Sequence, residues 1–130
     1  MKEREEILSM LRNLVLDRSA VDLMREEIAR LEENEKQKEL PAAQREALKK
    51  ESVKLQSCLV VTISHIRSVE RLLALLSPEE QKVLDWTLIH PRPEAVFDLA
   101  EELHCETARI YRIRSRAISK LVRLRYGAGE

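Results

Sequence analysis

The fold of the C-terminal part of this chain is decided by residues 94–126, which read EAVFDLAEELHCETARIYRIRSRAISKLVRLRY. The first eleven predict a helix whose inward-facing side chains we expect to be Val96, Phe97, Leu99, Ala100 and Leu103. After a short turn at Cys105 and Glu106, a longer helix is predicted from Thr107 to Tyr126, closed by Gly127. Two helices joined by so short a turn, the second strongly basic, are the layout of a helix-turn-helix.

The last helix is predicted to carry two rows of side chains. Its core row, spaced by threes and fours, is Ile110, Ile113, Ala117, Leu121 and Leu124. Its basic row follows the same spacing one residue out of phase and is Arg109, Arg112, Arg116, Lys120 and Arg123. One residue rotates a helix position by about 100°, so the basic row is expected to face solvent. The alternative is that the row is simply a solvated helix face.

The charge distribution favours a polyanion as the partner of this helix. Residues 107–126 hold seven basic groups and no acidic one, although the whole chain has no net charge. Guanidinium groups present planar forks of donors that suit phosphates and guanine edges. We expect base edges to be read near the helix start, by Glu106, Thr107, Ala108, Arg109 and Arg112. We expect phosphate contacts from Arg114, Arg116, Lys120 and Arg123, and the candidate DNA-binding set is completed by Tyr111 and Ser115.

A further helix is predicted to begin at Ser77. Serine caps free N–H groups, Pro78 suits the first helical position, and Glu80 lies three residues later, as in a capping box. The prolines in the stretch 90–93 are expected to end this helix. Trp86 is expected to pack within it, and the alternative is an exposed, partner-binding tryptophan.

Two stretches together resemble region 4 of sigma-70-type transcription factors: LSPEEQKVLDWTLIH, then VFDLAEELHCETARIYRIRSRAISKLVRL. The matching positions are Leu99-Ala100, Leu103, Ile110, Arg116-Ala117 and Lys120-Leu121. The resemblance covers about 50 of the 130 residues. Together with the long helical segment before it, the module is similar to phage late-transcription regulators of the ArpU and RinA type.

This resemblance implies a recognition helix in the major groove and a contact with RNA polymerase. One departure is Glu106, which stands at the helix cap where the family carries serine and is a poorer capping residue. Nothing in the chain resembles sigma regions 2 or 3, so a complete sigma factor is not expected.

Residues 1–76 are predicted to form an antiparallel, coiled-coil-like helical hairpin that turns near residues 40–42. Pro41 lies in a polar stretch between two heptad-spaced apolar runs, and proline cannot continue a helix interior. The first run is Ile7, Met10, Leu14, Val21, Met24, Ile28 and Leu31. The second is Leu48, Ser52, Leu55, Leu59, Thr62, Ile66, Val69, Leu73 and Leu76. Further apolar residues outside these runs indicate a partner surface: self-association, another protein, or the C-terminal module of residues 77–130.

The sequence thus predicts an all-α protein that acts as a dimeric, sequence-specific transcription regulator on double-stranded DNA. The alternative is an interaction adaptor that docks on RNA polymerase or another helical partner without reading DNA. We expect no enzyme activity, cofactor, metal or small-molecule substrate, because no nucleophile–base pair, glycine-rich loop or ligand cluster stands out. Two distant cysteines and the lack of a signal or membrane-spanning segment favour a cytoplasmic location.

Overall fold

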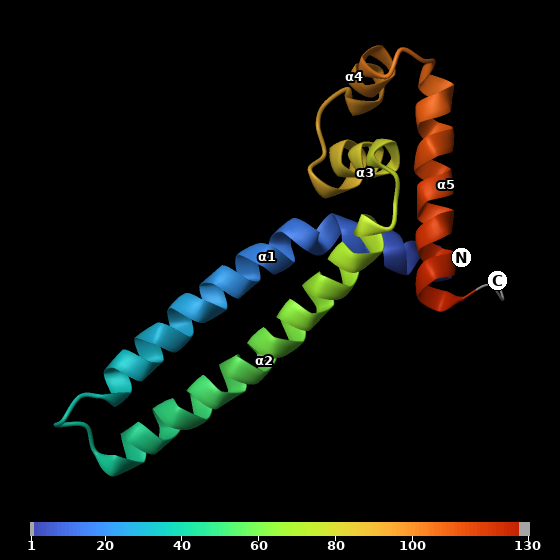
Figure 1. The fold of residues 1–130 in the computed structure, drawn as a ribbon. Coiled ribbons are helices and arrows are strands. Elements are labelled where there is room, and N and C mark those ends of the chain that lie inside the picture. The colour runs from blue at the N-terminus through green and yellow to red at the C-terminus, as the bar shows by residue number, and fades with distance from the viewer. Residues whose placement is uncertain (1, 128–130) are drawn as a thin grey trace. The chain divides into compact units, whose positions relative to one another are not determined.

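The computed structural model describes residues 2–127, and helices are the only regular secondary structure in this range. The elements, in order, are α1 (Lys2–Glu35), α2 (Ala42–Ala74), α3 (Pro78–Leu84), the π-helical turn η1 (Asp85–Ile89), α4 (Ala95–Glu102) and α5 (Thr107–Tyr126) (Figure 1). This confirms the predicted all-α class, with two long helices followed by shorter ones. Internal contacts divide the chain into two compact units, one made of residues 1–15 and 68–130 and the other of residues 16–67.

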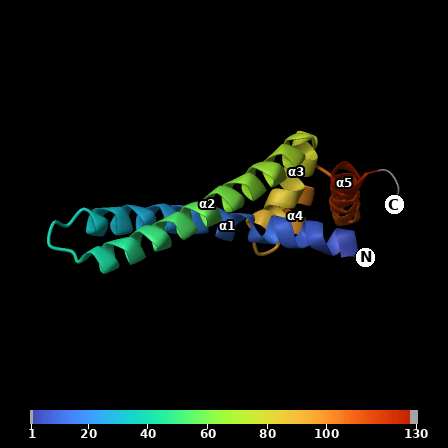
Figure 2. The ribbon, with the colours of Figure 1, turned by 90° about the horizontal axis from the view of Figure 1, so that it is seen from below.

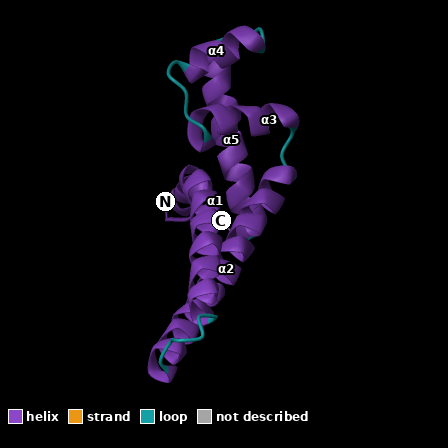
Figure 3. Ribbon diagram, turned by 90° about the vertical axis from the view of Figure 1, so that its left-hand side faces the viewer, coloured by secondary structure: helices purple, strands orange, loops and turns teal. Residues whose placement is uncertain are grey.

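The unit of residues 16–67 is a pair of antiparallel helices, the body of the predicted hairpin (Figures 1 and 3). Residues 36–41 join the helices, so the chain reverses where Pro41 indicates. Buried residues along the seam are Val21, Ile28, Leu31, Ser52 and Ile66, all of them members of the two predicted heptad runs. Heptad spacing therefore identified the surface that each helix buries against the other.

The other unit is built around α3, α4 and α5. Its core consists of the buried residues Val83, Leu99, Ala100 and Ile110. Trp86 is half-buried and packs against this cluster, as expected for a tryptophan inside the first helix of the module. Figure 2 looks nearly along α5, the helix that contributes Ile110 to the core.

The start of α3 confirms the predicted capping box. The hydroxyl of Ser77 accepts a hydrogen bond from the Glu80 amide at 3.2 Å, and the Ser77 amide donates to Glu80 Oε1 at 2.8 Å. The helix ends before the prolines, but through a feature that the sequence did not predict. Its last turn widens into the π-helical turn η1, where the His90 amide donates to the Asp85 carbonyl at 2.7 Å. Such turns are uncommon in helices.

Phe97 was predicted to face inward, and this is wrong: its side chain is 67% exposed. Phe97 comes two residues before the fully buried Leu99, and two residues turn a helix by about 200°. The phenyl ring therefore projects from the side of α4 opposite the core.

The core row of α5 was also partly wrong. Leu124 is exposed, whereas Ile118 and Val122 are buried. Both lie on the side of α5 that carries Ser115, three and seven residues further along the helix. This side has a partner within the same unit, because Arg4 of α1 donates to the hydroxyls of Ser115 and Ser119, each at 3.0 Å. The C-terminal half of α5 is thus buried on two sides.

The compact units therefore do not divide at residues 76 and 77, where the hairpin was predicted to meet the module. Residues 2–15 of α1 and residues 68–74 of α2 belong to the unit that contains α3, α4 and α5. Besides the Arg4 contacts, the hydroxyl of Tyr126 donates a hydrogen bond to the Glu6 carboxylate. This hydrogen bond raises the pKa of Tyr126 above its ordinary value.

Candidate nucleic-acid interface

Four residues, 103–106, connect α4 to α5 and set the direction of the basic helix. His104 adopts a left-handed backbone conformation, with φ of 53°, a position where glycine is favoured because other residues are strained there. The Cys105 amide then donates to the Ala100 carbonyl at 2.9 Å, and the half-buried Cys105 side chain packs against the core. A short, anchored turn of this kind is what a helix-turn-helix requires.

Glu106 stands at the N-cap of α5, and its side chain makes no capping hydrogen bond. The sequence had identified glutamate as a poor cap at this position. The free N–H groups of the first turn of α5 therefore have no side-chain partner from Glu106, and they carry the positive end of the helix dipole.

The basic row lies where the periodicity predicts it. Ile110 and Ala117 are fully buried, whereas all members of the row are exposed, namely Arg109, Arg112, Arg116, Lys120 and Arg123. Their positive charges line one side of α5, rotated away from the core. This surface is hereafter called the basic row.

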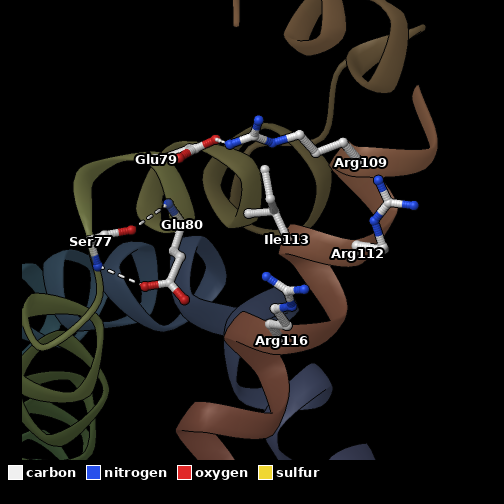
Figure 4. Close-up of a pocket in the computed structure, with 7 residues that line it drawn as sticks. All are labelled: Ser77, Glu79, Glu80, Arg109, Arg112, Ile113 and Arg116. Carbon is white, nitrogen blue, oxygen red and sulfur yellow. Dashed lines mark hydrogen bonds and ion pairs between the residues drawn. The ribbon is translucent and has the colours of Figure 1, made fainter. Parts of the chain in front are cut away.

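Two members of the basic row are paired with acidic residues of α3. Arg109 Nη2 donates to Glu79 Oε1 at 3.5 Å, and Lys120 Nζ donates to Glu80 Oε1 at 3.4 Å. Between these pairs is a hollow lined by Ser77, Glu79, Glu80, Arg109, Arg112, Ile113 and Arg116 (Figure 4). The pKa of Glu80 is lowered, first by the hydrogen bond from the Ser77 backbone and also by the charge of Lys120.

The remaining members of the basic row, Arg112, Arg116 and Arg123, form no ion pair within residues 2–127. Arg112 and Arg116 come from successive turns of α5 and line the same hollow (Figure 4). Their guanidinium groups are available to a polyanion without first breaking an internal contact.

The other candidate residues lie in different surroundings. Arg114 is half-buried between the positions of Ile110 and Ala117, and its Nε is buried with no hydrogen-bond partner. Ser115 is exposed but accepts from Arg4. Thr107 is half-buried, and the remaining candidates, Ala108 and Tyr111, are exposed. Arg114 and Ser115 therefore stand apart from the basic row.

Sequence reasoning missed the acidic residues that contact the row. Glu79 and Glu80 were recognised only as part of a helix start, because the pairing with α5 depends on how α3 packs against it. A second missed contact involves Arg92, whose guanidinium lies 3.6 Å from the centre of the Trp86 ring, with Lys82 Nζ at 5.0 Å from that centre. The position of Arg92 between two prolines was the only signal in the sequence. This stack ties the loop before α4 to the core.

Among residues 2–127 no group of three His, Cys, Asp or Glu side chains could hold a metal ion. No helix in that range is sufficiently long and apolar to cross a membrane. No protein-family model, curated protein or solved structure matches the chain.

Proposed function

We propose that this protein is a sequence-specific DNA-binding transcription regulator that inserts α5 into the major groove. The observation that carries the proposal is the basic row, five exposed cationic side chains on one side of a helix that follows a four-residue turn. A helix of this kind fits the width of the major groove, and its cations neutralise the phosphates on either side.

The positions along α5 suggest a division of roles. Arg109 and Arg112 lie in the first two turns, where a recognition helix approaches base edges, and an arginine fork pairs best with guanine. Arg116, Lys120 and Arg123 lie further along and are assigned to phosphates, which fix the helix in register but carry no sequence information. Glu106, Thr107 and Ala108 are close enough to the helix start to influence base choice.

The pairs with α3 suggest how the free protein holds its recognition surface. The carboxylates of Glu79 and Glu80 occupy positions beside Arg109 and Lys120 that DNA phosphates would take. Ion pairs between exposed groups contribute only about 0–1 kcal/mol, so phosphates can replace them at small cost. The pairs keep two flexible side chains extended across the hollow before DNA arrives.

The resemblance to sigma region 4 and to phage late-transcription regulators supports a role at promoters, and with it a contact to RNA polymerase. In this proposal the protein acts as a homodimer, which presents two copies of α5 to a repeated DNA sequence. Paired half-sites would be spaced by about one helical turn of DNA or a multiple of it.

Selection of bound fragments from genomic DNA tests this function. The expected result is a set of fragments that share a short motif and bind far more tightly than unrelated duplexes of equal length. Recovery of random fragments, with affinity independent of sequence, would contradict sequence-specific binding.

A second candidate function is an adaptor that docks on RNA polymerase or another helical partner, and the exposed Phe97 favours it. A large aromatic side chain on the surface is a frequent anchor in protein interfaces. Capture of RNA polymerase that is lost in Phe97→Ala, together with no selected DNA motif, would support the adaptor over the regulator.

A further inference from the structure

Part of α2 lacks charge on every side. Residues 55–66 contain no Asp, Glu, Lys or Arg, although these residues make up 35% of the chain. Within the unit of residues 16–67, α1 covers one side of this segment, and the apolar side chain of Val61 remains exposed. Exposed apolar side chains that gather on one part of a helix mark a surface for a further partner. The segment therefore requires a partner beyond α1.

Two short stripes of uncharged residues mark the surface in question. On α1, Leu16, Ala20 and Leu23 follow one another at spacings of four and three, and both leucines are about two-thirds exposed, at 67% and 65%. On α2, Cys58 and Val61 are three residues apart and both exposed. Each stripe is thus a line of uncharged, largely exposed side chains along its helix.

The two stripes lie on the same face of the hairpin. On the opposite face, Gln56 Nε2 of α2 donates to Glu32 Oε1 of α1 at 3.3 Å. Glu32 is nine residues from Leu23, about 180° around α1, and Gln56 is two residues from Cys58, about 200° around α2. Since Gln56 and Glu32 meet across one face, Leu23 and Cys58 belong to the other.

We propose that a second copy of this chain covers that face, which comprises Leu16, Ala20, Leu23, Cys58 and Val61 and is called here the pairing face. A two-fold axis along the hairpin lays α1 of one copy over α2 of the other and produces a four-helix bundle. The inference deepens the proposed function, because it names the surface that brings two recognition helices together.

The size of the face agrees with a dimer. The twenty residues of α1 in this unit extend about 30 Å, and two helices side by side are about 20 Å wide. The whole side of the hairpin that contains the pairing face therefore covers about 600 Å² before side-chain relief is counted, close to the ~800 Å² that each partner of a stable complex buries. A second hairpin offers a matching face of the same length.

The charges at the edge of the face also favour a second copy. Glu27 lies four residues after Leu23 on α1, and Lys54 lies four residues before Cys58 on α2, so each is on the same side of its helix as the pairing face. Both lie towards the turn of the hairpin, so the proposed axis brings Glu27 of one copy, which pairs with Arg30 on its own helix, near Lys54 of the other. The opposite face carries charges along α1 at Arg18, Asp22 and Arg25, which a second copy would have to desolvate.

Sedimentation velocity of the full chain, at low micromolar to several hundred micromolar, tests the pairing face. We expect a dimer for the unmodified chain and a monomer for Leu23→Glu, because the new carboxylate would be buried without a partner. The matched control is Val60→Glu, an equally exposed apolar residue, 66% accessible, on the side of α2 towards Gln56. It should remain dimeric. A monomeric wild type, or a dimer broken by Val60→Glu and not by Leu23→Glu, would overturn the proposal.

The reactivity of Cys58 gives a second readout that does not depend on a mutation. Its thiol is exposed in the single chain, so a maleimide should label it rapidly at low concentration and at least tenfold more slowly where the dimer forms. Peptide mass spectrometry separates its labelling from that of Cys105. Labelling that is independent of concentration, in a chain that sediments as a dimer, would place the contact elsewhere and overturn the pairing face.

DNA binding by the Leu23→Glu variant distinguishes a failure of the pairing face from a failure of the proposed function. The Leu23→Glu variant should bind a duplex with a single half-site as tightly as the wild type does. Its affinity should fall only for duplexes that carry two half-sites. If the mutant and the wild type both fail to bind DNA while the dimer behaves as expected, the proposed function fails and the pairing face stands.

Discussion

Arg112 and Arg125 are exposed side chains with the same charge on the same helix, but they project from different sides of it. Arg112 belongs to the basic row, whereas Arg125 lies thirteen residues further on, about 140° away around α5. Replacement of each by alanine, the best helix former, removes one positive charge and leaves the helix intact. Comparison of the two variants therefore shows whether DNA affinity depends on which side of α5 carries the charge or only on the net charge of the protein.

The structure sets the size of the expected effect. Arg112 forms no internal ion pair within residues 2–127, so Arg112→Ala removes only what it contributes to DNA. A bidentate arginine–guanine contact contributes about 1–3 kcal/mol, which is about 5- to 150-fold in affinity at 1.4 kcal/mol per tenfold. If Arg112 meets a phosphate instead, the slope of log affinity against log salt becomes shallower by ~0.9. Arg125→Ala should change affinity by less than about twofold.

Fluorescence anisotropy with a selected duplex, repeated at several salt concentrations, measures both quantities. Circular dichroism of the two variants checks that helix content is unchanged. Equal weakening by Arg112→Ala and Arg125→Ala would refute the reasoning, because binding would then follow net charge alone. Unchanged affinity in Arg112→Ala would remove α5 from the interface.

Three further results are expected. Glu79→Gln should strengthen DNA binding by up to about fivefold in the same assay, because Arg109 loses an internal ion pair that contributes about 0–1 kcal/mol. Weaker binding would show that Glu79 positions Arg109 for DNA and does not compete with DNA for it. In the folded chain the pKa of Glu80 lies below its ordinary value of 4.5, so ionised Glu80 stabilises the fold at pH values above 4.5. This contribution is lost as the pH falls through the lowered pKa. Urea unfolding between pH 7 and pH 3 should therefore depend less on pH in Glu80→Gln, and an identical pH dependence would show that the hydrogen bond with Ser77 does not govern it. Leu99→Ala should lower the free energy of unfolding by about 2–5 kcal/mol, because Leu99 is fully buried in the core of the α3–α5 unit, whereas a loss below about 1 kcal/mol would mean that this core is loosely packed.

Local patterns in the sequence were sufficient for much of the fold. The capping box at Ser77 and Glu80 involves residues three apart, so its chemistry is visible in the sequence itself. The heptad runs identified residues such as Val21 and Ile28 that are buried in the hairpin, and Pro41 marked the reversal. In each case the interaction is decided by spacing along one helix.

Features that depend on how helices pack were not predictable in this way. Leu11 is fully buried, although the predicted run contains its neighbour Met10, which is half-buried. Phe97 is apolar yet exposed, because α4 has room for only one buried side. Ile118 is buried on a second side of α5, the side on which Arg4 of α1 contacts Ser115, and the periodicity of α5 alone does not reveal that contact.

The candidate site shows the same division. Periodicity placed the basic row correctly, because the phase between Arg109 and Ile110 is a property of one helix. The row's pairing with Glu79 and Glu80 could not be predicted, because residues thirty to forty positions apart meet only after α3 packs against α5. Arg114 was expected to contact phosphate, although it is half-buried and its phase on α5 lies close to the core.

The salt dependence of binding to a selected duplex tests the central claim most directly. If the basic row meets DNA, log affinity should fall linearly with log salt. The expected slope is about −3 if only the three cations assigned to phosphates, Arg116, Lys120 and Arg123, each neutralise one, and about −4.5 if all five cations do. Arg112→Glu should abolish specific binding while the helical signal persists. A slope near zero, or equal affinity in Arg112→Glu, would contradict the account.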